Sequence, residues 1–265
     1  MTDSKGQIRV GIGGWTYEPW RDNFFPKGHP QKLELEYASA HVTAIEINGT
    51  FYSRQKPKTW ADWARRTPDD FVFALKASRY AVTRKQLAEA GEAIANFLEQ
   101  GLVELGPKLG PILWQFAGTR KFDREDIARF LNLLPESHGG LKLRHAIEPR
   151  HETFRDAAFV TLCRDRNAAI VIADDETYPQ IADITADFTY ARLQRQREDE
   201  PTGYSPAELD QWAEVAKSWA GGHSPRGLDY VGGPHPAAQR DAFVFMINGA
   251  KVRAPAAAMA LLERL

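Results

Sequence analysis

The most constraining feature of this chain is a set of short apolar segments that end in polar or charged residues of one side-chain parity. In Ile45-Glu46-Ile47-Asn48 the two isoleucines point one way and the two polar groups point the other way, because side chains alternate along a strand. The same polar phase recurs at the ends of the other segments, at Lys76, Gln115, Glu148, Arg150, Asp174, Arg192 and Asn248. In a closed barrel of parallel strands these groups would converge on one pocket at the carboxyl ends.

Length and composition fit one barrel domain. The 265 residues match a single (β/α)8 barrel, which typically has about 250 residues, so we predict one α/β TIM-barrel domain over residues 1–265. The hydrophobic fraction of 43% and the charged fraction of 26% are ordinary for a globular protein. The single cysteine, Cys163, excludes an internal disulfide and a multi-cysteine metal cluster, and it suits a reducing cytoplasm.

The overall charge argues against two classes of partner. With 34 basic and 35 acidic side chains the net charge is -1, so bulk attraction to nucleic acid or to an anionic membrane is not implied. Residues 1–7 are polar, and no run of about 18 apolar residues occurs in the chain. We therefore expect a cytoplasmic protein without a membrane span, and the sequence leaves the oligomeric state open.

Strand-like segments alternate with helical patterns along the chain. The strands are expected to start near Ile8, Thr43, Phe71, Pro111, Leu143, Ala169, Asp187 and Asp241. Apolar residues at three- and four-residue spacing predict helices over 32–41, 58–66, 85–100, 124–134, 153–167 and 206–219. Asp123 is an expected helix cap, and Ser205 with Pro206 and Glu208 forms an expected capping box. Eight such units favour closure into a barrel, although 177–184 holds at most a short helix and leaves an open doubly wound sheet as the alternative.

Several longer motifs occur in an order that resembles the uncharacterised YecE-like family. They are GIGGWTYEPW followed by FFP, then AIEINGTFY, WARRTPDDFVFALKASR, EPRHETF, ADDE, YARL and YSPAELDQWA. The resemblance implies a (β/α)8 barrel remotely similar to sugar isomerases, and it brings no established reaction with it. The family usually has serine, histidine, phenylalanine, histidine and asparagine at the positions of Gly13, Arg84, Pro149, Gln194 and Ala257, which points to a divergent substrate or weakened activity.

The charged residues at the strand ends form the predicted site. Three carboxylates balance three cations, namely Glu46, Glu148 and Asp174 against Lys76, Arg150 and Arg192. Burying an ion costs several kcal/mol, so six charges at strand ends are a poor choice for stability alone. Lys76 could act as a base or form a Schiff base beside two arginines, or it could stay charged beside Glu46 and bind an anion, which we favour. The alternative for Glu148 and Arg150 is a buried pair that touches no ligand.

Residues that follow the strands are further candidates for ligand binding. His151 turns away from Arg150 by parity, so its alternative role is a hydrogen-bonded histidine in a loop or helix cap. Trp15, Tyr17 and Tyr52 follow the first two strands. These aromatic rings are expected either to stack on a sugar or base, or to cover the top of the barrel.

A metal site has weaker support. Glu46, Glu148, His151 and Asp174 offer carboxylate and imidazole donors, but no short spacing such as HExxH is present. We therefore predict no cofactor and keep a divalent metal as an alternative.

We predict a small polar or anionic ligand and a proton transfer of isomerase or lyase type. The catalytic candidates are Glu148 or Glu46 as proton carrier, Lys76 to stabilise enolate charge, and Asp174. The substrate-binding candidates are Arg150, Arg192, Asn48, Gln115, Asn248, Trp15, Tyr17, Tyr52 and His151. Two alternatives stay open: a metal-assisted phosphodiesterase acting on nucleotides or nucleic acid, and a non-catalytic ligand sensor or scaffold.

Overall fold

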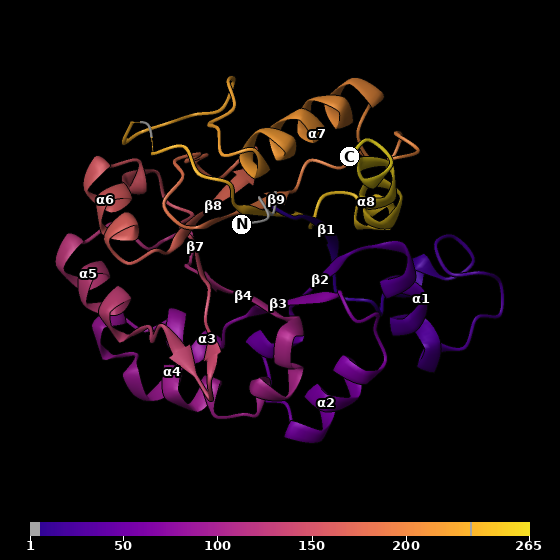
Figure 1. The fold of residues 1–265 in the computed structure, drawn as a ribbon, viewed down its shortest axis with the longest axis horizontal. Coiled ribbons are helices and arrows are strands. Elements are labelled where there is room, and N and C mark those ends of the chain that lie inside the picture. Colours follow the sequence, from indigo (N-terminus) through magenta and orange to yellow (C-terminus); the bar gives the residue numbers. More distant parts are fainter. Residues whose placement is uncertain (1–5, 234) are drawn as a thin grey trace, which may run out of the picture.

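A computed structural model describes residues 6–233 and 235–265 of the chain. Eight parallel strands close into a barrel in the order β1-β10-β9-β8-β7-β4-β3-β2, with helices around the outside (Figure 1). The barrel strands are β1 (Ile8–Gly13), β2 (Ala44–Ile47), β3 (Val72–Lys76), β4 (Leu109–Gln115), β7 (His145–Glu148), β8 (Ala169–Asp174), β9 (Phe188–Leu193) and β10 (Asp241–Met246). The predicted TIM barrel is confirmed as a single α/β domain, and the open-sheet alternative is wrong because β1 pairs with both β2 and β10.

The helices follow the strands and cover the barrel. They are α1 (Glu34–His41), α2 (Pro57–Arg65), α3 (Arg79–Val82), α4 (Gly91–Leu98), α5 (Arg124–Leu133), α6 (Ala157–Asp165), α7 (Pro206–Ala220) and α8 (Ala254–Leu262). The Asp123 carboxylate caps α5 by accepting backbone N–H groups, and Ser205 with Glu208 forms the expected capping box of α7. Local side-chain chemistry therefore sets these two helix starts, as the sequence predicted.

The expected helices differ from the observed ones where backbone groups find other partners. The expected helix over 85–100 is shorter, because Asp126 accepts the backbone N–H groups of Leu87 and Ala88 and a 3₁₀ turn precedes α4. Asp156 caps α6, which therefore starts four residues later than expected. A small hairpin of β5 (Ser137–His138) and β6 (Leu141–Lys142) and the apolar helix α8 were not among the expected elements. Residues 175–187, all described, hold no helix, which agrees with the weak sixth unit.

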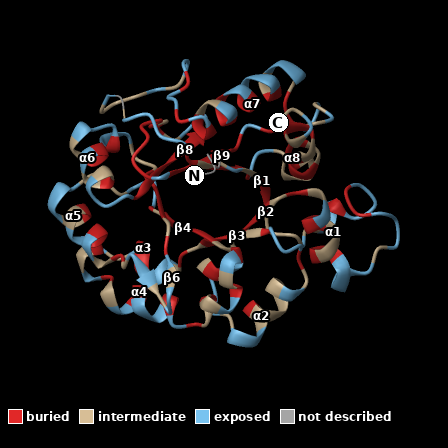
Figure 2. Ribbon diagram, viewed as in Figure 1, coloured by how far each residue is buried: buried red, intermediate tan, exposed pale blue. Residues whose placement is uncertain are grey.

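Two apolar layers build the core. The helix-facing sides of the strands carry one layer, and the buried residues in Figure 2 follow the strands and the inner sides of the helices. The second layer fills the barrel axis, with alanines on β2, β3, β7 and β8 facing aromatic rings on β9 and β10. The packed residues on the axis include Ala44, Ala74, Leu113, Ala146, Ala169, Val171, Phe188, Tyr190, Phe243 and Phe245. This filling closes the barrel below and leaves the polar groups of the strand ends in the layer above it.

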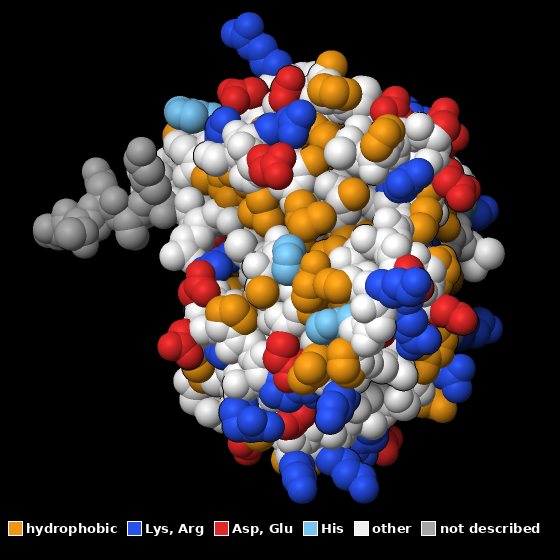
Figure 3. Space-filling model, turned by 90° about the vertical axis from the view of Figure 1, so that its right-hand side faces the viewer, with side chains coloured by type: hydrophobic (Ala, Val, Ile, Leu, Met, Phe, Trp, Pro, Cys, Tyr) orange, Lys and Arg blue, Asp and Glu red, His pale blue; other side chains and the backbone are white. Residues whose placement is uncertain are grey.

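The outer surface mixes charges of both signs. On the face shown in Figure 3, acidic and basic side chains are interspersed with hydrophobic ones. No helix in the described part of the chain is long and apolar enough to cross a membrane.

Candidate functional site

A buried ion cluster of Glu46, Glu148, Tyr190 and Arg192 lies on the barrel axis. The Arg192 guanidinium donates to both oxygens of Glu46 at 3.0 and 3.1 Å, and its Nη1 donates to both oxygens of Glu148 at 2.8 and 2.9 Å. The Tyr190 hydroxyl donates to Glu46 Oε2 at 2.7 Å. One guanidinium thus joins carboxylates from β2 and β7, which lie on different sides of the barrel.

The Glu148 carboxylate is held as an anion. Gln115 Nε2 donates to its Oε2 at 2.6 Å, and Arg150 donates to its Oε1 through Nε and Nη2 at 3.2 and 3.0 Å. Burial opposes the charged form, but Arg192, Arg150 and the hydrogen bond from Gln115 outweigh it and lower the pKa of Glu148. Burial also raises the pKa of Tyr190 well above its usual value, with a further contribution from Glu46, so the phenol stays a donor.

The β-strand register explains why these groups meet. Gln115 lies beside Glu148 in the pairing of β4 with β7, and Arg192 and Tyr190 share the inward face of β9. Because these side chains project from paired strands, the backbone hydrogen bonds of the barrel hold their positions. Such geometry allows Coulomb attraction to offset the cost of burying four charged or strongly polar groups.

A cavity of about 290 Å³ lies at the carboxyl ends of the strands. Its lining comes from most of the barrel and comprises Gly13, Asn48, Tyr52, Lys76, Gln115, Arg150, Arg192, Met246, Ile247, Asn248 and Lys251. We call this space the central cavity. Glu46 and Glu148 are fully buried beneath it rather than in its lining, so the cavity wall is rich in cations and amides.

Lys76 ends β3 and contributes an ammonium group to the wall of the central cavity. Its Nζ lies 4.6 Å from the centre of the Phe51 ring, and no ion pair within 4.0 Å ties it to a carboxylate of the described residues. Burial lowers the pKa of Lys76 to about 8, and the positive charge of Arg192 acts in the same direction. The group therefore changes protonation close to neutral pH.

Lys251 is a second cation in this wall and follows β10 in the 3₁₀ turn Lys251–Arg253. Its Nζ lies 4.4 Å from the ring centre of Tyr17 and 5.5 Å from that of Trp20. The Trp20 indole in turn donates to the Lys251 carbonyl at 2.8 Å. Aromatic faces hold the ammonium in place without neutralising it, and burial lowers its pKa.

Amides and one stacked arginine complete the wall. Asn248 adopts a left-handed φ of 59°, and its Nδ2 donates to Gln194 Oε1 at 2.8 Å. The Arg150 guanidinium lies 4.2 Å from the Tyr178 ring centre and donates to the Tyr178 hydroxyl at 3.3 Å. Stacking and the pair with Glu148 fix the orientation of Arg150 at the cavity.

The expected position of Asp174 on the inner face is wrong. Asp174 is paired with Leu193, and it shares the helix-facing side of β8 with Ile172, whereas Ala173 faces the axis beside Arg192. Its carboxylate accepts from the Tyr204 hydroxyl at 2.9 Å and lies 3.5 Å from Arg195. Burial raises its pKa, against the opposing effects of Tyr204 and Arg195. Every residue of β8 before Asp174 is apolar, so this strand has no alternation of polar and apolar residues from which its phase could be read.

Of the candidate residues that follow the strands, one lines the central cavity and the others contact neighbouring protein groups. Tyr52 lines the central cavity, whereas Trp15 packs edge-on against Trp63 at 5.1 Å on the helix side. Tyr17 supports Lys251, as described above. His151 caps a 3₁₀ turn by accepting the backbone N–H of Thr153 at 3.2 Å, which matches the loop-or-cap alternative rather than a ligand-facing position.

Three residues with polar side chains at the site, Tyr178, Tyr190 and Lys251, were not among the sequence candidates. Tyr190 lies two positions before Arg192, so strand parity alone would have indicated it. Tyr178 and Lys251 lie in irregular segments, where no periodicity indicates a direction. Their places depend on how the loops after β8 and β10 cross the barrel end.

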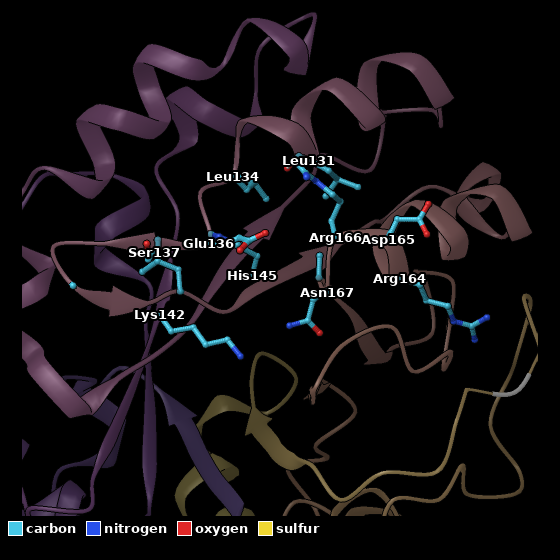
Figure 4. Close-up of a pocket in the computed structure, with 13 residues that line it drawn as sticks. Leu131, Leu134, Glu136, Ser137, Lys142, His145, Arg164, Asp165, Arg166 and Asn167 are labelled. Atoms are coloured by element: carbon cyan, nitrogen blue, oxygen red, sulfur yellow. Dashed lines mark hydrogen bonds between the residues drawn. The ribbon is translucent and has the colours of Figure 1, made fainter.

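A larger cavity of about 640 Å³ lies at the opposite end of the barrel, beside the start of β7 and the end of α6 (Figure 4). Several of its polar groups already have protein partners: Lys142 pairs with Asp187, and Arg164 donates to the Gly232 and Gly233 carbonyls. His145 is held between Trp114 and the Pro135 carbonyl. We therefore place the candidate site at the carboxyl ends, where (β/α)8 barrels carry their active sites.

The closed ring of eight parallel strands and its helices define a (β/α)8 barrel with a polar cavity at the carboxyl ends of the strands. The chain belongs to the family described as protein of unknown function DUF72, whose model matches residues 9–265, and the YecE-like resemblance is thereby confirmed. The curated relative UPF0759 protein YunF from Bacillus subtilis (strain 168) is 26% identical over 127 residues. That match covers 46% of this chain and 44% of the relative, which is less than half of its length.

Solved structures share the fold at low sequence identity. A DUF72 family protein from Thermotoga maritima MSB8 has a TM-score of 0.72 and 22% identity, covering 97% of this chain and 98% of that one. The structure of SacUVDE has a TM-score of 0.56 and 10% identity, covering 98% and 100% of the two chains. These similarities establish the barrel, and the chemistry has to be argued from the residues.

Proposed function

We propose that the protein binds a small anionic, polyhydroxy compound in the central cavity and transfers a proton on it, in a reaction of isomerase or lyase type. The observation that carries this proposal is that Lys76 and Lys251 face the cavity without an ion-pair partner within 4.0 Å among the described residues. Partly buried cations that lack a protein counter-ion favour an anionic ligand. Arg150, fixed by Tyr178 and Glu148, adds planar donors for a carboxylate or phosphate.

Lys76 is our choice for the group that moves the proton. A pKa of about 8 lets its amine and ammonium forms coexist near neutral pH, which is the condition for general acid-base catalysis. Both oxygens of Glu46 and of Glu148 already accept hydrogen bonds, and the pKa of Glu148 is lowered. We therefore assign the two glutamates to holding Arg192, and the amides of Asn48, Gln115 and Asn248 to orienting hydroxyls.

The donor set makes a metal-assisted phosphodiesterase the weaker alternative. Within residues 6–233 and 235–265, no group of three or more His, Cys, Asp and Glu side chains is placed to hold a metal ion. Glu46 and Glu148 are occupied by Arg192, and Asp174 lies on the other face of its strand. A non-catalytic sensor would use the same cations, so the test below separates binding from turnover.

Proton exchange with solvent tests the proposal. The protein is incubated in deuterated water with a panel of sugar phosphates and hydroxy acids, and deuterium on carbon is followed by NMR. For a substrate so found, Lys76→Met should slow exchange by about 10²- to 10⁴-fold, the usual contribution of general acid-base catalysis. Lys85→Met, at an exposed position, is the matched control.

Two outcomes would redirect the assignment. A normal exchange rate in Lys76→Met, together with a strongly reduced rate in Glu148→Gln, would assign the proton transfer to Glu148. Ligand binding without exchange in the native protein, retained in both variants, would favour the sensor.

A further inference from the structure

A second cavity of about 270 Å³ lies beside the central cavity, past the ends of β2 and β3. Its lining includes Thr50, Tyr52, Ser78, Tyr80 and Arg84. Tyr52 belongs to the lining of both cavities, so the two cavities adjoin at this residue. The Thr50 hydroxyl also lies 2.6 Å from the Lys76 carbonyl, which ties this wall to the strand end that carries the lysine.

The second cavity carries unusually exposed aromatic rings. Tyr52 is 68% exposed and Tyr80 is 61% exposed, and the other large hydrophobic side chains exposed in the described residues are Leu33 and Leu265. Both exposed aromatic side chains in that set therefore line the same cavity. Aromatic rings combine a large apolar face with a polar edge, so clustered exposed rings mark a place where another ring packs.

Tyr80 is positioned by its surroundings. Ser78 caps α3 and accepts the Tyr80 backbone N–H at 3.3 Å, while Arg84 donates to the Tyr80 carbonyl at 3.0 Å. Arg79 lies 5.2 Å from the ring centre and donates to the hydroxyl at 3.3 Å. These bonds fix the backbone of Tyr80 just after β3, and its exposed ring lines the solvent side of the second cavity.

The rim of the second cavity is polar. Ser53, Glu92 and Asn96 line it along with the rings, so hydroxyl, carboxylate and amide groups stand beside the apolar faces. A sugar ring presents both an apolar face and several hydroxyls, which this combination matches.

We propose that the ligand is elongated, with its anionic end in the central cavity and a sugar ring in the second cavity between Tyr52 and Tyr80. This rests on the proposed function and narrows the substrate class to glycosides or larger sugars that carry a phosphate or carboxylate.

Titration calorimetry with four probes tests the inference: inorganic phosphate, glucose 6-phosphate, trehalose 6-phosphate and adenosine monophosphate. Trehalose 6-phosphate should bind about 10-fold or more tightly than inorganic phosphate, because ring packing adds to the anion contact. Tyr80→Ala should remove about 5- to 10-fold of this gain and leave the phosphate affinity unchanged. Tyr80→Phe should keep the gain, and Leu33→Ala, outside both linings, should not alter it.

The outcomes separate the two proposals. Equal affinity for phosphate and trehalose 6-phosphate, or an unaltered gain in Tyr80→Ala, overturns the second cavity and leaves the anion site standing. Absence of phosphate binding, with trehalose 6-phosphate bound in a Tyr80-dependent way, supports the second cavity and overturns the anion site. If neither inorganic phosphate nor trehalose 6-phosphate binds, both proposals are overturned. If adenosine monophosphate binds more tightly than glucose 6-phosphate and trehalose 6-phosphate, the assignment of a sugar ring to the second cavity is overturned.

Discussion

The buried ion cluster and the two lysines of the central cavity lie at the same end of the barrel, but they differ in how their charges are paired. Arg192 is 1% exposed and shares two carboxylates, whereas Lys76 and Lys251 rest against aromatic rings. A charge that is paired on every side serves to fix its neighbours. A charge that has no ion-pair partner within 4.0 Å is available to a ligand, which is the role that we propose for the two lysines.

Removing the centre of the buried ion cluster should have the largest effect. Arg192→Met removes the only ion-pair partner that the buried Glu46 has among the described residues and leaves Glu148 with Arg150 alone, so the free energy of unfolding should fall by about 3 to 5 kcal/mol. Urea unfolding followed by circular dichroism measures the change.

Arg195→Met is the matched control for this variant. Arg195 is about half exposed and lies 3.5 Å from Asp174, so its loss should cost less than about 1 kcal/mol. If Arg192→Met and Arg195→Met lowered the free energy of unfolding equally, the distinction between the buried ion cluster and the other charged groups would be contradicted.

Lys76→Met should raise stability while it removes activity. The folded state holds this ammonium at a penalty, since burial and Arg192 lower its pKa from 10.5 to about 8. Replacing it with an apolar side chain of similar length should increase the free energy of unfolding at pH 7 by about 1 to 3 kcal/mol.

The pH dependence gives the sign of the Lys76 effect. Below pH 8 both the folded and the unfolded states carry the proton, so the full penalty is present. Between pH 8 and 10.5 the folded state has lost the proton that the unfolded state still holds, so native stability rises relative to the variant. A constant difference between the two proteins from pH 7 to 10.5 would show that Lys76 is not destabilising as a cation.

The charge of Lys76 should also affect the affinity for anions, by a smaller free energy than its effect on stability. Sulfate, which does not titrate in this range, should bind the native protein about 5- to 10-fold more weakly at pH 9 than at pH 7, because Lys76 loses its charge. Lys76→Arg keeps the charge and should flatten this dependence. Calorimetry at the two pH values measures it, and an equally steep dependence in Lys76→Arg would move the effect to Lys251.

Much of the site was predictable because strand parity carries direction. Glu46, Glu148, Arg150 and Arg192 follow apolar residues in clear alternation, and the structure brings all four together. Asp174 ends a strand that is apolar on both faces, and there the parity argument failed. His151 adopts the capping role that local spacing allows.

The sequence by itself determined the eight barrel strands and their alternation with helices, two helix caps and most of the polar groups at the strand ends. These features depend on contacts between near neighbours and on the two-residue period of a strand. Only the tertiary structure decided which charges are paired. Arg192 pairs with both glutamates because the closed barrel brings β2, β7 and β9 to one axis, and within the described residues Lys76 and Lys251 have no ion-pair partner within 4.0 Å. Pairing across a barrel depends on distances between residues more than 40 positions apart, which no local pattern encodes.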